Sequence, residues 1–180
     1  MKKTDINANR FVRKWTRREL AGRALWSLCG PLFRGSPRLF WGWRRMLLRL
    51  FGAKVGNGVH IHPSAVIFIP WNLEIGDFSS IGFDSMIYNL GPLKIGSRVT
   101  VSQRTHLCGG SHDHKDPAMP LLKCPIGIGD DSWICADAFV GPSIRIGAHS
   151  IVAAAAVVVH DVPPATIVAG NPARPVRQRS

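Results

Sequence analysis

The stretch LCGGSHDHKDP, residues 107–117, holds the residues of this 180-residue chain best suited to proton transfer or metal binding. His112, Asp113, His114 and Asp116 fall within five positions. An imidazole gains and loses a proton near neutral pH, so it can act as a general base, and it is also a common metal ligand. Asp113 and Asp116 could orient an imidazole, although solvation in a loop explains either carboxylate more simply. The stretch is therefore the first candidate for a catalytic site.

An aliphatic repeat with a period of six surrounds this polar stretch. A period of six fits neither a helix, at 3.6, nor a strand, at two, but it fits a solenoid of short strands in which every sixth side chain points inward. The many β-branched residues favour strands, and a glycine after the first member of each triplet suits a turn or a close backbone approach. We therefore predict an all-β solenoid in which three hexads form one coil. The five triplets are Val55, Ile61, Ile67; Ile75, Ile81, Ile87; Ile95, Val101, Leu107; Ile128, Ile134, Val140; and Ile146, Val152, Val158.

The repeat is interrupted once, between Leu107 and Ile128. The two residues are 21 positions apart, where a step of six or eight would continue the repeat. The surplus is predicted to leave the solenoid as an excursion loop over residues 109–125, and long loops in compact repeats are usually functional or disordered. The predicted organisation is a basic, tryptophan-rich helical N-terminal segment (1–53), a hexapeptide β-helix (54–162) and a C-terminal tail (163–180).

The hexads, the loop motif GSHDHKDP, the segment IGDDSWICADAFVGPSIRIG and the closing VPPATIVAGNPARPVR resemble the hexapeptide-repeat acyltransferases. Together with RRMLLRLFGAKVG and IPWNLEIGD, they are most similar to the O-acetyltransferases of colanic-acid-type exopolysaccharide biosynthesis. The resemblance covers residues 38–177. It implies a left-handed parallel β-helix, a homotrimer, and acetyl-CoA bound between neighbouring subunits. It also implies acetyl transfer to the hydroxyl of a sugar. The acceptor can be a sugar, a nucleotide-linked sugar or a lipid-linked sugar, and the sequence leaves this choice open.

The resemblance also implies residue roles. The histidine of its Ser-His-Asp motif falls on His112, which would take the proton of the acceptor hydroxyl. The chain has no G-x-S-x-G nucleophile elbow, so direct transfer without a covalent enzyme intermediate is expected. Trp133 matches a tryptophan near the active site, and Ala136 matches the position whose backbone N–H faces the thioester carbonyl. Ala154 matches a position along the pantetheine arm, and Arg177 matches a basic residue near the nucleotide.

The acceptor site is less well defined by the sequence. Gly82 stands where sugar-specific relatives carry an asparagine. Polar residues in the same coil and in the excursion loop are candidates for binding the acceptor, although exposed surface is the simpler role for each. These candidates are Asp84, Tyr88, Asn89 and His114.

Nearly all of the net charge of +12 lies in residues 1–50, which carry 13 of the 23 Lys and Arg residues but only two acidic residues. Residues 38–51 have the spacing of an amphipathic helix with arginines on its other side. Residues 10–51 therefore fit either a helical segment at an anionic membrane surface or a cap over the open end of the solenoid, and both remain open. Nucleic-acid binding is not expected, because no recognised motif accompanies the charge. The apolar side comprises Leu39, Phe40, Trp43, Met46, Leu47, Leu50 and Phe51.

Two further functions fit the same fold. His106, His112 and His114 could hold a catalytic zinc ion, as in a carbonic-anhydrase-like hydratase. The sequence around Trp133 and the NPARPVR tail favour the acyltransferase, so no metal is expected, and His106 is expected to contact a wall of the solenoid or a neighbouring subunit. The second alternative is an inactive trimeric scaffold. No apolar stretch of about 20 residues occurs, and we expect a cytoplasmic protein, free or peripheral on the inner face of the cytoplasmic membrane.

Overall fold

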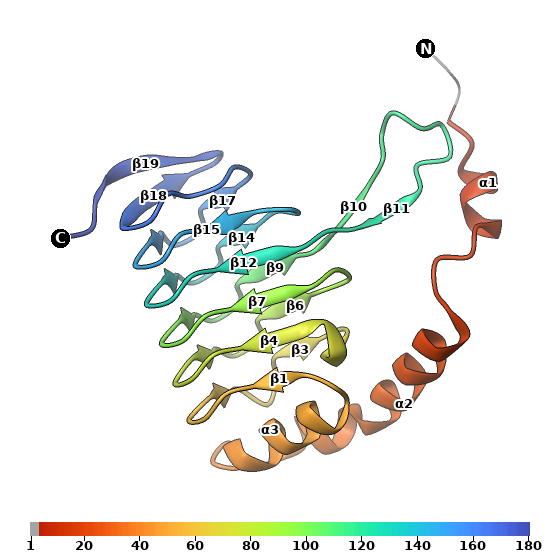
Figure 1. Ribbon diagram of the computed structural model, residues 1–180, viewed down its shortest axis with the longest axis horizontal. Helices are drawn as coiled ribbons and strands as arrows, with labels where there is room; N and C mark the ends of the chain where they lie inside the picture. Colours follow the sequence, from red (N-terminus) through yellow and green to blue (C-terminus); the bar gives the residue numbers. More distant parts are fainter. Residues whose placement is uncertain (1–3) are drawn as a thin grey trace.

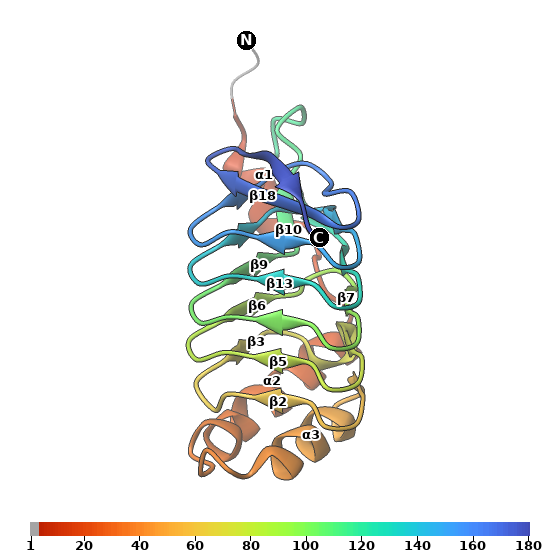
Figure 2. The same ribbon diagram turned by 90° about the vertical axis from the view of Figure 1, so that its left-hand side faces the viewer.

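The computed structural model describes residues 4–180 as a parallel β-solenoid preceded by three helices (Figures 1 and 2). This architecture confirms the predicted all-β solenoid with a helical N-terminal segment. No helix within residues 4–180 combines the length and the apolar character needed to cross a bilayer. The helices are α1 (Ile6–Phe11), α2 (Arg17–Arg34), α3 (Trp41–Leu50) and the 3-10 turn η1 (Pro70–Asn72).

Three sheets, which we call A, B and C, form the sides of the solenoid. Sheet A contains, in spatial order, β1 (Lys54–Val55), β4 (Leu73–Ile75), β7 (Leu93–Ile95), β12 (Ile126–Ile128) and β15 (Arg145–Ile146). Sheet B contains β2 (His60–Ile61), β5 (Ser80–Ile81), β8 (Thr100–Val101), β13 (Trp133–Ile134), β16 (Ile151–Val152), β18 (Thr166–Gly170) and β19 (Ala173–Gln178). Sheet C contains β3 (Val66–Ile67), β6 (Met86–Tyr88), β9 (His106–Cys108), β14 (Phe139–Val140) and β17 (Val157–Val158).

The hexad positions form the core. All fifteen predicted inward residues are buried. Neighbouring strands are parallel and in register, apart from the antiparallel pair β18 and β19, so that Ile75 lies beside Ile95 in sheet A and Ile87 beside Leu107 in sheet C. Each aliphatic side chain therefore packs on its equivalent in the next coil, and removal of these side chains from water is the main contribution to stability.

The glycines that follow the first member of each triplet allow close approach of adjacent coils. A Cβ atom on Gly76 would lie 2.6 Å from the Ser97 nitrogen and from the Gly96 carbonyl carbon. The left-handed conformation at this corner belongs to Phe78, two positions later, with φ of 57°. The glycine is therefore required by the packing of backbone on backbone, and not by its own φ angle.

Because of this packing, we predict that the substitution Gly76→Ala destabilises the fold. The added methyl group meets backbone that cannot move aside, so we expect the free energy of unfolding to fall by about 1–3 kcal/mol. Gly127→Ala is the matched control, because its Cβ would meet only the Arg145 Cγ, at 3.9 Å. Thermal melts of the two variants test the prediction, which equal melting temperatures would contradict.

The excursion from the repeat is a β-hairpin. The chain leaves the solenoid after β9 and forms β10 (Gly110–His112) and β11 (Leu121–Lys123), which pair antiparallel, before it returns at β12. Because β9 belongs to sheet C and β12 to sheet A, the hairpin projects from the corner between these sheets. Figure 1 shows it rising beside the upper coils, with α1 next to its tip.

Helix α3 caps the lower end of the solenoid (Figures 1 and 2). In the first coil the strands have no neighbour below, so their carbonyl groups need donors. Arg44 Nε donates to Ile61 O at 2.7 Å, Arg45 Nη1 to Val59 O at 2.9 Å and Arg49 Nε to Val55 O at 2.9 Å. Arg44 is fully buried, and burial lowers the pKa of its guanidinium. Helix α3 therefore faces the solenoid with its arginines and with Leu47 and Leu48, which are both buried.

Candidate active site

His112 lies on β10, opposite Leu121 of β11, and its side chain is exposed. Its Nδ1 lies 2.6 Å from the Met119 carbonyl oxygen. A carbonyl oxygen only accepts hydrogen bonds, so Nδ1 carries the proton of the neutral ring and Nε2 keeps its lone pair. The geometry thus leaves the outer nitrogen of His112 available as a base.

The carboxylates of the excursion do not orient His112. Asp113 Oδ1 accepts the Lys115 N–H at 3.0 Å, and Asp116 Oδ1 accepts the Ala118 N–H at 2.8 Å. Both are therefore used to form turns at the hairpin tip. His114 is exposed in the same tip.

The N-terminal arm, residues 5–19, holds the hairpin. Asn9 Nδ2 donates at 2.8 Å to the same Met119 carbonyl oxygen that binds His112, and the Asp5 N–H donates at 2.8 Å to Pro117 O. The sequence analysis missed Asn9 and Met119. No sequence signal points to Met119, because its backbone carbonyl, and not its side chain, makes the contact. Only the structure shows its unusual backbone conformation, with φ of 46°.

A second contact fixes the arm lower on the hairpin. Lys123 Nζ of β11 lies 3.1 Å from Glu19 Oε1 and 3.8 Å from the centre of the Trp15 ring. Glu19 Oε2 also accepts the Thr16 N–H at 2.7 Å in a capping box. The Thr16 hydrogen bond and Lys123 lower the pKa of Glu19 from 4.5 to about 2. The same carboxylate therefore caps α2 and ties the arm to the hairpin.

The low pKa of Glu19 predicts that its contribution to the stability of the fold depends on pH. In the unfolded chain Glu19 binds its proton near pH 4.5, whereas in the folded chain it stays charged down to about pH 2. Its contribution to stability is thus fully present above pH 4.5 and lost as the pH falls through about 2. We expect Glu19→Gln to melt at a lower temperature than the unaltered protein at pH 6, with a difference that shrinks between pH 4.5 and 2. A difference that did not change with pH in thermal melts would contradict a role for the charge.

The four residues predicted to contact acetyl-CoA lie on sheet B and beside it. Trp133 of β13 and Arg177 of β19 belong to one cross-strand row, in which Ile151 and Ile167 stand between them. Trp133 is 46% exposed, and its Nε1 donates to Ser102 Oγ at 2.9 Å. The row crosses three strand spacings, or about 14 Å. An elongated ligand can therefore lie across the outer face of this sheet.

Ala136 and Ala154 lie in adjacent coils at the corner between sheets B and C. The Ala155 N–H donates to Ala136 O at 2.9 Å, and Ala154 is exposed. Within residues 4–180, nothing accepts a hydrogen bond from the Ala136 N–H. This donor is thus free to bind an external oxygen. Arg104 and Asp137 form a two-pronged ion pair beside it, at 2.6 and 2.8 Å, which lowers the pKa of Asp137.

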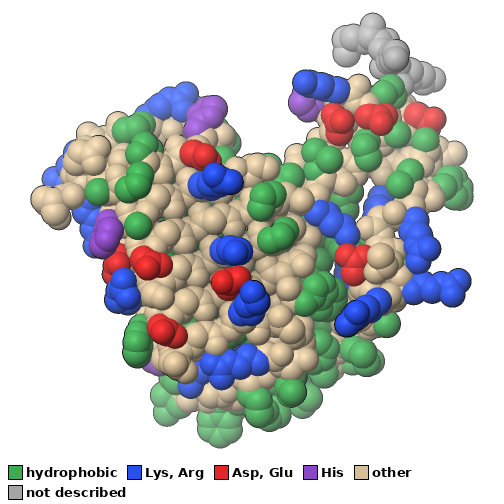
Figure 3. All heavy atoms as spheres, in the orientation of Figure 1, with side chains coloured by type: hydrophobic (Ala, Val, Ile, Leu, Met, Phe, Trp, Pro, Cys, Tyr) green, Lys and Arg blue, Asp and Glu red, His purple; other side chains and the backbone are tan. Residues whose placement is uncertain are grey.

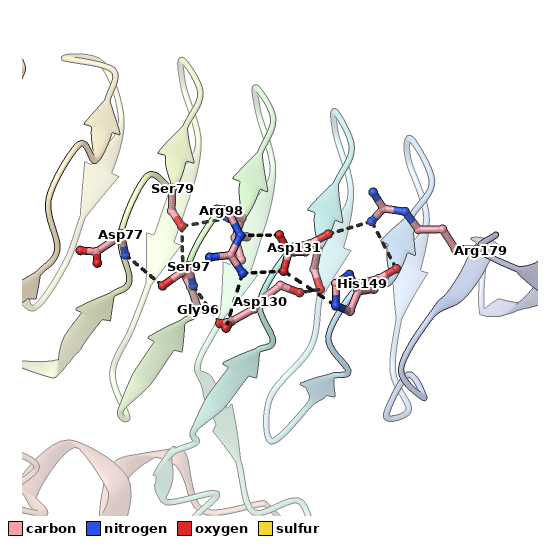
Figure 4. Close-up of polar contacts among 11 residues, drawn as sticks. Asp77, Ser79, Gly96, Ser97, Arg98, Asp130, Asp131, His149 and Arg179 are labelled. Carbon is pink, nitrogen blue, oxygen red and sulfur yellow. Dashed lines mark hydrogen bonds and ion pairs between the residues drawn. The ribbon is translucent and has the colours of Figure 1, made fainter.

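The tail that carries Arg177 is anchored at the corner between sheets A and B (Figure 4). Arg179 Nη1 donates to Asp131 O at 2.7 Å and to His149 O at 3.2 Å. Asp131 in turn receives hydrogen bonds from Arg98 at 2.6 and 2.7 Å, which lower the pKa of its carboxyl. Arg177 itself is exposed on β19.

The acceptor candidates have different surroundings. Tyr88 packs against Phe68 beside the base of the hairpin, where a Cβ on Gly110 would meet its ring. Asp84 is exposed at the corner between sheets B and C. Asn89 is fully buried, and its amide exchanges two hydrogen bonds with the Ile69 backbone. This corrects the expectation for Asn89, whose polar atoms hold two coils together.

One chain does not assemble a complete site. The hairpin with His112 projects from the corner between sheets A and C, and sheet B is the side opposite that corner. Figure 2 shows β13 in front and the hairpin behind the solenoid. The candidate base and the candidate acetyl-CoA residues are thus on opposite sides of the chain.

The three histidines of the zinc alternative are not gathered in one chain either. His106 lies on the outer face of sheet C between Tyr88 and Phe139, and burial lowers its pKa. Its Nε2 is buried and has no hydrogen-bond partner within the described residues. Across residues 4–180, no group of three or more His, Cys, Asp or Glu side chains is placed to hold a metal ion.

Comparison with known proteins identifies clear relatives. No family model matches the sequence. The chain is 40% identical, over 86% of its length and 85% of the relative's, to the colanic acid biosynthesis acetyltransferase WcaF of Escherichia coli. It is 27% identical to the galactoside O-acetyltransferase of the same species, over 75% of this chain and 68% of the relative. The solved structure of a hexapeptide-repeat acetyltransferase from Vibrio cholerae with acetyl coenzyme A superposes with a TM-score of 0.84 at 27% identity, covering 96% of this chain and 95% of the other.

Proposed function

The chain belongs to the hexapeptide-repeat acetyltransferase family that includes WcaF, and from this membership we propose that it transfers the acetyl group of acetyl-CoA to a sugar hydroxyl in exopolysaccharide biosynthesis. The proposed acceptor is a precursor sugar, linked to a nucleotide or to a lipid. We further propose that the working form is a homotrimer, peripheral at the inner face of the cytoplasmic membrane.

The proposed reaction is a direct transfer with His112 as general base. Nε2 of His112 takes the proton of the acceptor hydroxyl while the hydroxyl oxygen attacks the thioester carbonyl carbon. The Ala136 N–H donates to the oxygen that becomes negative in the tetrahedral intermediate. Collapse of the intermediate breaks the carbon–sulfur bond, and the departing thiolate takes the proton from the imidazolium. The acetylated sugar and free coenzyme A are the products.

The observation that carries the catalytic proposal is the hydrogen bond between His112 Nδ1 and Met119 O, which leaves Nε2 unprotonated in the neutral ring. The proposal of a trimer is supported by the separation of His112 from sheet B within one chain. Trp133, Ala136, Ala154 and Arg177 of one subunit would bind acetyl-CoA, and the hairpin of its neighbour would supply the base. Tyr88, Asp84 and His114 would face the acceptor.

The first experiment is a calorimetric titration of acetyl-CoA into the purified protein. We expect micromolar affinity and about one site per chain, as an acetyltransferase of this kind requires. Release of free coenzyme A is then followed with a panel of sugar, nucleotide-sugar and lipid-linked acceptors. Absence of acetyl-CoA binding by the folded protein would refute the proposed activity and favour the scaffold.

A further inference from the structure

Helices α2 and α3 present apolar side chains to solvent at the lower end of the solenoid. The exposed fractions reach 76% for Leu28, 80% for Leu39 and 73% for Leu50. Figure 3 shows hydrophobic side chains gathered at this end of the molecule. We call this set the α2–α3 apolar face, which comprises Leu25, Leu28, Leu32, Leu39, Phe40, Trp43, Met46 and Leu50.

The two helices form one continuous face. Trp43 Nε1 of α3 donates to Leu32 O of α2 at 3.1 Å, which joins the helices at one end of the face. Leu25 and Leu50 line the same hollow, which joins them at the other end. An exposed apolar surface of this kind is a sign of an interaction site, because isolated apolar side chains on a surface are common but contiguous ones are not.

The orientation of this face is fixed by the cap. Arg44, Arg45 and Arg49 point from α3 toward the solenoid, where they bind the carbonyl groups of the first coil. Rotation of α3 to bury Met46 and Leu50 would leave these carbonyls without donors and would expose Leu47 and Leu48, which are buried in the core. Trp43, Met46 and Leu50 are therefore held outward by the same contacts that close the solenoid.

Cations lie at both ends of the face. Arg18 lines the hollow with Leu25 and Leu50, and Arg34 and Arg38 are exposed at the turn that joins the two helices. Glu19 is the sole acidic residue between positions 17 and 51, and it is engaged with Lys123. An apolar surface with a tryptophan and a basic rim is complementary to the interface of a bilayer that contains anionic lipid.

We propose that the α2–α3 apolar face docks the protein on an anionic lipid bilayer, with the axis of the solenoid pointing away from the membrane. Leu28, Leu39 and Leu50 enter the acyl boundary, and the basic rim binds the phosphate groups of the lipids. A second copy of the chain fits the face less well. In a twofold contact the same surface meets itself, so that Arg34 and Arg38 of one copy would lie near the cations of the other and repel them. This proposal rests on the peripheral location proposed above, which it deepens by naming the surface that binds, and it does not depend on the proposed acetyl transfer.

The test is flotation of the full-length protein with lipid vesicles. One vesicle preparation contains phosphatidylcholine alone, and the other also contains phosphatidylglycerol. The variant Leu28→Gln/Leu39→Gln/Leu50→Gln removes apolar surface without changing the net charge, and Phe78→Gln, at a residue that is 69% exposed on the solenoid, is the matched control. Circular dichroism, mass by light scattering and acetyl-CoA titration are measured on every preparation.

We expect the unaltered protein and the Phe78→Gln control to float with the anionic vesicles and to dissociate at high salt. The triple variant should partition at least about tenfold more weakly, because three apolar side chains no longer enter the bilayer. Acetyl-CoA binding should be the same for all three proteins. Failure of the unaltered protein to float, equal flotation of the triple variant, or a change of mass in the triple variant would overturn the proposal. The last outcome would identify the face as a contact between copies of the chain.

Discussion

Replacement of His112 by alanine should lower kcat for acetyl transfer about 10³-fold and leave the Kd for acetyl-CoA unchanged. The imidazole is proposed to take the hydroxyl proton as the new bond forms, and removal of a general base costs about 10²–10⁴ in rate. Sheet B and its corner with sheet C are proposed to bind acetyl-CoA, whereas His112 is proposed to act on the acceptor hydroxyl and not to bind acetyl-CoA. Single-turnover rates and calorimetry on the same preparation separate the two effects.

Two matched variants distinguish a chemical role from a structural one. The amide of His112→Gln can still donate to Met119 O, which holds the ring at 2.6 Å, but it cannot accept a proton. It should therefore be as inactive as the alanine variant while keeping the hairpin ordered in hydrogen exchange. His114→Ala should keep near-normal kcat and change only the KM for the acceptor, because His114, exposed at the hairpin tip, is proposed to face the acceptor and not to take its proton. More than a tenth of normal activity in either His112 variant would contradict the assignment.

The solenoid was predictable because its signal is repeated. A side chain such as Leu107 points inward because of its place in a repeat of six residues. All fifteen equivalent positions carry Val, Ile or Leu, so the repeat can be recognised in the sequence itself. The excursion was also predictable, since 21 positions separate Leu107 from Ile128. Its hairpin form and its contact with the N-terminal arm were not, because these depend on pairing between segments that are remote in the sequence. Asn9 and Met119, for example, are 110 positions apart.

The orientation of α3 could not be read from its pattern. The arginines pack on the first coil, together with the buried Leu47 and Leu48, because the strands there have no neighbouring strand to donate to their carbonyl groups. This need for donors arises only once the coil has formed. Asn89 shows the same limit at a single residue. Its sequence position suggested an exposed polar group, whereas it exchanges two hydrogen bonds with Ile69 in the coil below. The residues next to such a polar side chain in the sequence do not reveal that it will form hydrogen bonds with the backbone of another coil.

In the proposed homotrimer, mixing two variants that should each be inactive is expected to recover about a third of normal activity. One variant is His112→Ala, which lacks the base. The other is Ala154→Trp, whose indole should fill the groove at the corner of sheets B and C, and which should fold because Ala154 is exposed. If each site takes its base from one subunit and its acetyl-CoA residues from the next, every mixed trimer of either composition contains one intact site among three.

The recovery of activity depends only on where the parts of the site lie. If His112 and Ala154 served the same site within one chain, every chain of a mixed trimer would be defective and no activity would return. The two variants are coexpressed with different tags, and trimers that carry both tags are isolated and compared with a blend of the separately assembled variants. The blend must stay inactive, because no chain is exchanged. Activity of the mixed trimers near a third would support a shared site, as the placement of the hairpin opposite sheet B requires, and activity no higher than that of the blend would refute it.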